Sequence, residues 1–160
     1  FMTGIVTAPN LLILKSYRQL GLKTPVLANY NMSVPVYMTA AKGLIDGVTF
    51  VDAFDPAKPA TQKFIEAFRK DSGTDPYNLN GYGYDGIMLV ADAITRAGST
   101  DKDKVRAAMQ ATKGFKGVMG GVDATYGFAE GKRTGFDTNG MVVRVYEGDK
   151  QGKVLHVGSK

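Results

Sequence analysis

The chain has 160 residues, of which 44% are hydrophobic and 22% charged, enough apolar sequence for one ordinary domain or two small ones. It contains no cysteine, which excludes disulfides, thiolate metal sites and cysteine nucleophiles. The formal net charge is +5, but acids interrupt the lysines and arginines throughout, so the pattern favours a mixed solvated surface over a nucleic-acid-binding face.

The first third of the chain predicts strands that alternate with helices. Short apolar runs at 1–6, 24–28 and 47–51 are typical of buried strands. Between them, the spacing of apolar residues predicts a helix from Thr7 to Gly21 and a short one over 34–42. Strands joined by helices imply right-handed crossovers and a parallel sheet.

The middle of the chain predicts a linker followed by helices. Residues 54–59 carry two prolines among polar and small residues, which is typical of a linker. Apolar residues then recur at helical spacing in 60–70, 83–97 and 101–111.

The tail of the chain predicts a hairpin. Residues 141–146 alternate as a strand, and 153–157 form a returning strand. His156, the only histidine, falls in this last strand, where a surface or edge position is expected rather than a catalytic or metal-binding one.

Three glycines raise the question of a nucleotide site. Gly81, Gly83 and Gly86 spell the G-x-G-x-x-G pattern of a dinucleotide-binding turn, which must follow a strand and open a helix. Residues 71–78 before them are polar and contain glycine and proline, so they predict a loop rather than a strand. This context argues against NAD or FAD.

No catalytic constellation is recognisable in the sequence. Asp46, Asp52 and Asp55 cluster around the third predicted strand, but their setting is typical of solvated surface acids. No serine has a G-x-S-x-G setting. Tyrosines do gather around the start of the predicted helix 83–97, at 77, 82 and 84, where they either pack between helices or contact a ligand.

Four segments resemble one protein family in order and spacing. Residues 84–98 are similar to Y-D-A-x-x-x-x-A-x-A-I-x-x-A-G, and 101–108 are similar to D-x-x-x-V-R-x-A. Residues 115–121 resemble F-x-G-V-x-G-x, and 17–27 resemble L-R-x-L-G-x-K-x-P-V-L. Together they resemble the type I periplasmic solute-binding proteins of ABC importers, the Leu/Ile/Val-binding group.

The resemblance implies an α/β fold made of parts of two Rossmann-like lobes, with the N-terminal portion missing. It implies that residues 1–56 form part of lobe 2 (βαβαβ), that 57–135 form the helical part of lobe 1, and that 136–160 return to lobe 2 as a hairpin. In that family the glycines border the ligand cleft, where small residues let backbone and helix approach closely. The isolated chain is expected to self-associate or to pair with the missing part, because it leaves apolar surface uncovered.

The resemblance also implies a function without catalysis or a cofactor. The protein is expected to be an exported, periplasmic component that binds a small-molecule solute and delivers it to the membrane permease subunits of an ABC importer. A ligand-sensing domain of a receptor or regulator with the same fold remains an alternative, and an α/β enzyme is a third.

The resemblance assigns four residues to the solute. Tyr84 matches a tyrosine that contacts the ligand, and Thr7 falls near another contact. Asn29 and Tyr30 occupy the loop where amino-acid binders place an acid against the ligand's ammonium. No acid stands at 28–31. Since a buried ammonium without a charged partner is costly, an aromatic or other organic acid is favoured over a branched-chain amino acid, with Tyr30 and Tyr84 flanking its ring.

Overall fold

The computed structural model of the chain describes residues 2–3 and 9–157. Five strands of this part form one sheet in the order β1–β2–β3–β4–β5. β1, β2 and β3 are parallel, whereas β4 runs antiparallel to β3 and β5 antiparallel to β4. The strands are β1 (Met2–Thr3), β2 (Leu27–Ala28), β3 (Thr49–Asp52), β4 (Val142–Glu147) and β5 (Lys150–Val157).

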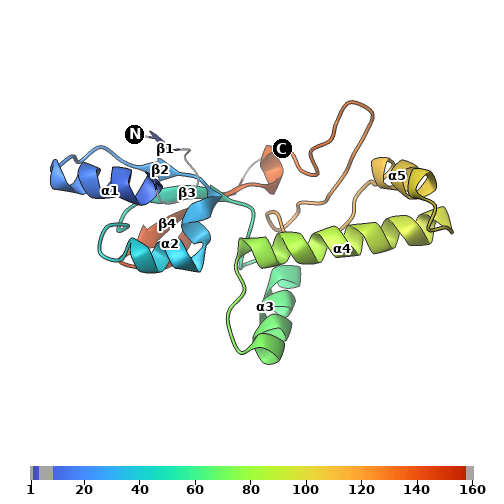
Figure 1. The fold of residues 1–160 in the computed structure, drawn as a ribbon, viewed down its shortest axis with the longest axis horizontal. Coiled ribbons are helices and arrows are strands. Elements are labelled where there is room, and N and C mark those ends of the chain that lie inside the picture. The colour runs from blue at the N-terminus through green and yellow to red at the C-terminus, as the bar shows by residue number, and fades with distance from the viewer. Residues whose placement is uncertain (1, 4–8, 158–160) are drawn as a thin grey trace.

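The helices fall into two groups at opposite ends of the molecule (Figure 1). α1 and α2 lie with the sheet, whereas α4 extends away from it, with α3 near its start and α5 at its far end. The helices and 3₁₀ turns are α1 (Pro9–Gln19), η1 (Tyr30–Ser33), α2 (Pro35–Ala40), α3 (Pro59–Ser72), α4 (Asn78–Ala97), α5 (Lys102–Gln110) and η2 (Thr138–Gly140). The α/β class, the strand–helix alternation and the terminal hairpin are therefore as predicted, although β2 is shorter than the predicted strand.

Helix α4 begins earlier than predicted. It starts at Asn78 rather than at Gly83, and the Asn80 side chain accepts a hydrogen bond of 3.1 Å from the Tyr77 amide in its first turn. Asparagines that favour a loop in sequence here supply polar contacts at a helix start. Gly81 and Gly83 consequently lie inside a helix, and no strand leads into them, which excludes the dinucleotide-binding turn.

The predicted linker after β3 is a buried crossing. Phe54, Asp55 and Lys58 are all buried, and the Gly120 amide donates to the Ala53 carbonyl at 2.6 Å. The interpretation of Asp52 and Asp55 as solvated surface acids is wrong, since both side chains are buried. The reason is that a distant segment, around Gly120, covers this crossing.

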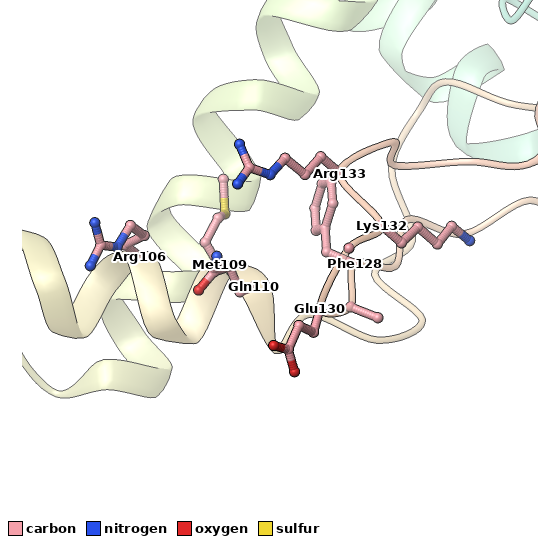
Figure 2. Close-up of a pocket in the computed structure, with 9 residues that line it drawn as sticks. Arg106, Met109, Gln110, Phe128, Glu130, Lys132 and Arg133 are labelled. Atoms are coloured by element: carbon pink, nitrogen blue, oxygen red, sulfur yellow. The ribbon is translucent and has the colours of Figure 1, made fainter.

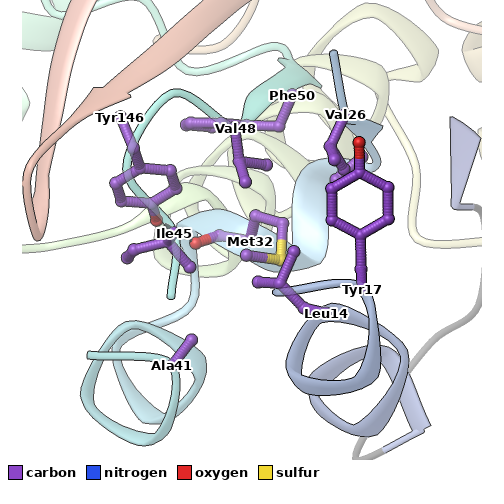
Figure 3. Packing of buried hydrophobic residues seen from close by; sticks show 10 residues of the cluster. Leu14, Tyr17, Val26, Met32, Ala41, Ile45, Val48, Phe50 and Tyr146 are labelled. Atoms are coloured by element: carbon purple, nitrogen blue, oxygen red, sulfur yellow. Dashed lines mark hydrogen bonds between the residues drawn. The ribbon is translucent and has the colours of Figure 1, made fainter. Parts of the chain in front are cut away.

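The first hydrophobic cluster lies against the sheet. Figure 3 shows Leu14 and Tyr17 of α1 approaching Met32 and Phe50, with Tyr146 of β4 on the other side. The Phe50 and Tyr146 rings lie 5.2 Å apart, and the Tyr146 hydroxyl donates to the Met32 carbonyl. We call this set the sheet cluster: Leu14, Tyr17, Val26, Ala28, Met32, Ala41, Ile45, Val48, Phe50 and Tyr146.

The second hydrophobic cluster joins α3 and α4 to the irregular segment that follows α5. We call it the helix cluster: Ala53, Phe54, Phe64, Leu89, Val118, Met119 and Tyr126. Gly81 allows α4 to approach it closely, because a Cβ at this position would stand 2.3 Å from the Met119 sulfur. Gly83 and Gly86 have open space where a Cβ would be, so the expected close approach holds at Gly81 alone among these three.

Candidate functional site

The carboxyl ends of the parallel strands form a polar edge. Asn29 and Tyr30 follow β2 directly, and Asp52 is the last residue of β3. In open α/β sheets, ligands bind outside the carboxyl ends of the strands. This strand edge is therefore the place where the fold itself favours a binding site.

Helix α4 is tied to the strand edge by its first residue. The fully buried Asn78 side chain donates from Nδ2 to the Tyr30 carbonyl at 3.1 Å and to Asp52 Oδ1 at 3.2 Å. One amide thus connects β2 and β3 to the start of α4. The sequence gives no signal for this role, because Asn78 ends a stretch that is typical of a loop.

Two phenols border the strand edge, one from each side. Tyr30 is 42% exposed, and Tyr82, one turn into α4, is 37% exposed. Burial raises the pKa of Tyr82 to about 12, with further contributions from Asp52 and Tyr30. Both rings can meet a solute, and the Tyr82 hydroxyl stays protonated as a hydrogen-bond donor at neutral pH. The sequence alone did not decide whether the Tyr82 ring packs between helices or contacts a ligand.

Tyr84 lies on another side of α4. Two residues along a helix correspond to a rotation of about 200°, which carries Tyr84 away from Tyr82. Its ring stands 5.1 Å from that of Phe64 on α3 and lines a cavity of about 490 Å³ between α3, α4 and residues 115–118. The structure thus groups Tyr30 with Tyr82 and places Tyr84 against α3.

Of the other two residues predicted to contact the solute, Asn29 and Thr7, the structure describes only Asn29. Asn29 caps η1: its Oδ1 accepts from the Asn31 amide at 3.2 Å and from Asn31 Nδ2 at 3.1 Å. That oxygen is therefore engaged within its own loop. Thr7 lies outside the described residues.

Asp85 fastens α4 to the 115–121 segment. Its carboxylate accepts from the Val118 amide at 2.8 Å, the Met119 amide at 2.9 Å and the Tyr126 hydroxyl at 2.8 Å. A Cβ on residue 117 would stand 2.3 Å from this carboxylate, so the close approach requires Gly117. Two segments recognised separately in the sequence, 84–98 and 115–121, are thus one physical unit.

A buried lysine completes this unit. Lys58 Nζ donates to the Met119 carbonyl at 2.7 Å and to the Ala124 carbonyl at 3.2 Å. Burial lowers the pKa of Lys58, and the nearby charges of Asp85 and Asp55 oppose that effect. Lys58 and Asp85 thus bind backbone groups of the same segment, and the Asp85 contacts hold α4 against it and so position Tyr82 and Tyr84.

A further cavity, of about 630 Å³, lies between α5 and residues 128–133 (Figure 2). The charged ends of Arg106 and Lys132 point in opposite directions there. Each is already in an ion pair, with Asp103 at 3.3 Å and Asp137 at 2.7 Å respectively. The basic groups do not converge on one point, so we do not place the solute in this cavity.

The part of the chain that the structure describes lacks two further features. Within residues 2–3 and 9–157, no cluster of three or more acidic, histidine or cysteine side chains is suited to hold a metal ion. In the same part of the chain, no helix combines the length and apolar character needed to cross a membrane.

Comparison with solved structures finds the same arrangement in longer proteins. The structure is similar to a leucine-binding protein LivK from Thermotoga maritima, with 25% identity, a TM-score of 0.83, and coverage of 98% of this chain but 43% of that one. It is also similar to the isoleucine-bound LivJ of Streptococcus pneumoniae, at 17% identity and a TM-score of 0.78, covering 99% of this chain and 44% of that one. A branched-chain amino acid ABC transporter from Thermus thermophilus with bound valine matches at 18% identity and a TM-score of 0.75, over 99% of this chain and 45% of that one.

The chain spans less than half the length of these proteins. Its fold is part of the type I periplasmic-binding-protein fold, as the resemblance implied. The search of curated proteins finds no match. Residues 1–151 match the family described as periplasmic binding protein, and the chain belongs to that family.

Proposed function

We propose that the chain is the C-terminal part of an extracytoplasmic solute-binding component of an ABC import system, which binds a small organic solute without transforming it. The observation that carries the proposal is the Asn78 amide, which ties the start of α4 to the strand edge and sets Tyr30 and Tyr82 beside it. The similarity to a leucine-binding protein and to a branched-chain amino acid ABC transporter supports the same assignment.

The division into lobes is part of this proposal. Residues 1–56 and 136–160 belong to lobe 2, and 57–135 belong to lobe 1. The two core clusters support the division, since the sheet cluster draws on residues 14–50 and Tyr146, whereas the helix cluster begins at Ala53. Hinge motion at the crossings would close the cleft on a solute.

The proposed solute is an aromatic or other organic acid rather than a branched-chain amino acid. Residues 28–31 carry no acid that could pair with an ammonium group, and the neighbouring Asp52 is buried. Tyr30 and Tyr82 offer ring faces and hydroxyl groups, which suit a ring and a carboxylate. The leucine, isoleucine and valine named for the relatives keep the amino-acid class as the comparison to test.

Tyr84, Thr7, Asn29 and Tyr30 remain our proposed solute contacts, and we propose Tyr82 as a further one because it borders the strand edge. Tyr84 has a second role open to it, because it lines an apolar cavity rather than the strand edge. Delivery of the solute to membrane permease subunits, and a periplasmic location, are proposed with the import function.

The same cavity suggests where the rest of a longer chain would pack. Tyr84, Met88 and Ile87 of α4 are exposed, the last to 72%, beside the hollow between α3 and α4. We propose that the part of the longer fold that this chain does not span covers this face, and that the isolated chain pairs with it or self-associates. Ile87→Lys should then shift the isolated chain toward monomer in analytical ultracentrifugation, and an unchanged distribution would speak against this face.

The test of the function is calorimetric titration of the full gene product with aromatic acids, aliphatic organic acids and branched-chain amino acids. Binding of one acid class, with weaker or absent binding of leucine, isoleucine and valine, is the expected result. Binding of the amino acids alone would overturn the proposed solute class. The absence of binding across all three classes, in protein that unfolds cooperatively, would overturn the solute-binding function itself.

A further inference from the structure

Three buried polar side chains lie together where the chain passes from the sheet cluster to the helix cluster. Asp52 ends β3, Asn78 begins α4, and Arg144 lies in β4; they are 1%, 0% and 6% exposed. Each keeps one atom without a hydrogen-bond partner: Asp52 Oδ2, Asn78 Oδ1 and Arg144 Nε. Unpartnered buried polar atoms are rare and costly, so this group calls for a physical explanation.

The hydrogen bonds around Asn78 fix the direction of its amide. Nδ2 donates both to the Tyr30 carbonyl and to Asp52 Oδ1, both of which are acceptors. Exchanging the amide oxygen and nitrogen would set the oxygen against these two acceptors. Asn78 Oδ1 and Asp52 Oδ2 are therefore both acceptors, and neither can satisfy the other unless a proton lies between them.

Arg144 does not resolve this conflict. Its Nη1 donates to Gln151 Oε1 at 2.6 Å and its Nη2 to the Gly152 carbonyl at 3.5 Å. Asp52 and Arg144 do not form an ion pair. The ion pairs of the described residues, with nitrogen–oxygen distances of 4.0 Å or less, all lie elsewhere. An ionised Asp52 would thus be buried without a direct cationic partner.

We propose that Asp52 binds a proton in the folded chain and donates it from Oδ2 to Asn78 Oδ1, so that a neutral acid–amide pair links β3 to α4. A single hydrogen bond then satisfies both Asp52 Oδ2 and Asn78 Oδ1, two of the three atoms without a partner. Burial, the largest influence, raises the pKa of Asp52, and the hydrogen-bonding groups of Ala53, Asn78 and Ser33 and the charge of Arg144 only partly oppose it. The Ser33 hydroxyl donates its one proton to the Tyr30 carbonyl at 2.7 Å, so Asp52 Oδ2 receives no proton from it. Loss of the proton sets two acceptor oxygens against each other and weakens the link between the clusters.

The groups that face Asp52 from the packed elements do not titrate with it. On β4 these are Arg144, which stays charged, and Tyr146, whose pKa burial raises to about 12. On α4 the facing group is Tyr82, whose pKa is also raised to about 12. Ser33 of η1 is not ionisable in this range. Of the groups named, only Asp52 is a carboxylic acid, and burial raises its pKa from 3.8, so its protonation governs the pH dependence of the pair.

The pH dependence has a definite sign. Because the folded-state pKa of Asp52 is raised above 3.8, its contribution favours the folded chain most at low pH and is lost as pH rises through the folded value. Asp52→Asn should remove this dependence, since its amide nitrogen can donate to Asn78 Oδ1 at every pH. The inference concerns stability and does not rest on solute binding.

Thermal unfolding of the intact gene product tests the proposal with three proteins: wild type, Asp52→Asn, and Asp71→Asn, which changes an exposed acid of α3. Between about pH 4 and about pH 8 the Tm of Asp52→Asn should rise relative to wild type by at least about 2 °C, and that of Asp71→Asn should not. The opposite trend, with Asp52→Asn losing stability relative to wild type as pH rises, would mark an ionised Asp52 and overturn the proposal, as would a constant difference.

A second measurement on the wild type covers the case in which Asp52→Asn fails to fold. The ¹³C resonance of the Asp52 carboxyl, assigned through its own β-protons, should titrate clearly above the ordinary aspartate value of about 3.9. Titration of the Asp52 carboxyl at or below that ordinary value would overturn the proposal. The readout follows the proton itself, so a merely structural role for Asp52 would not reproduce it.

Discussion

The two clusters hold their elements together by different means. The sheet cluster consists of apolar side chains with two tyrosines, and its segments meet through ring and methyl contacts. The helix cluster is held in addition by buried Asp85 and Lys58, which bind backbone groups of the irregular segment after α5. Apolar contacts tolerate small adjustments, whereas a buried carboxylate requires its donors at fixed positions. The residues that carry α4, and hence Tyr82 and Tyr84, therefore depend on a few polar contacts.

Asp85→Ala should have the largest effect on stability. It leaves two buried amides and one buried hydroxyl without an acceptor and removes a charge near Lys58, so we expect a loss of about 3–5 kcal/mol. Urea denaturation measures the loss, and amide exchange should accelerate at Val118 and Met119. Asp92→Ala, on the partly exposed side of α4, should cost no more than about 1 kcal/mol.

Phe50→Ala provides the matching truncation in the sheet cluster, for comparison with Asp85→Ala. Its side chain is fully buried, and truncation should also cost about 3–5 kcal/mol, but by leaving a cavity. Amide exchange at Val118 and Met119 should rise only with global unfolding in this variant. If both variants loosen these amides equally through local opening, the two clusters do not differ in the way proposed.

Gly117→Ala should cause the next largest loss of stability. The added Cβ would stand 2.3 Å from the Asp85 carboxylate, so the segment or the carboxylate must move, at a cost of about 2 kcal/mol. Combining Gly117→Ala with Asp85→Ala should cost less than the sum of the two changes, because both break the same contact. Simple additivity in urea denaturation would contradict the close packing of these two residues.

Much of the architecture follows from local patterns, but the polar contacts between distant segments do not. Helical spacing located α3 and α5, and β-branched runs located β3 and β4. The hydrogen bond from Asn78 to the Tyr30 carbonyl spans 48 residues, so no local pattern announces it. The same holds for Asp52 and Asp55, whose burial depends on segments remote in sequence.

The candidate site, too, could be predicted only in part, because it depends on how distant segments meet. The resemblance supplied Tyr30 and Tyr84 as contacts, and Tyr30 does lie at the strand edge. Tyr82 could have been separated from Tyr84 only by knowing where α4 begins and which of its faces meets the strand edge. A helix start at Asn78 places Asn78, Gly81 and Asp85 on the buried face, and Tyr82 then follows at its border.

Tyr82→Ala should weaken solute binding roughly tenfold, or by about 1.5 kcal/mol, since it removes a ring at the strand edge. Tyr82→Phe should retain most of the affinity if the ring face matters more than the hydroxyl. Tyr84→Ala should weaken binding by more than about 1 kcal/mol if Tyr84 contacts the solute as the resemblance implies. Calorimetric titration of the full gene product measures all three, and an affinity unchanged by Tyr82→Ala would remove Tyr82 from the site.

The smallest expected effect on stability is a gain, and it should come from a glycine inside α4. Gly83 lies in a helix interior with open space around its missing Cβ, so Gly83→Ala in the isolated chain should stabilise it by about 0.5–1 kcal/mol. Gly98, which ends α4 at φ +58°, should instead lose stability on the same change, because alanine rarely adopts this conformation. Urea denaturation of the two variants separates helix propensity from backbone strain. If Gly83→Ala destabilised the chain, α4 would need a flexible start, and its attachment through Asn78 would be weaker than the hydrogen bonds indicate.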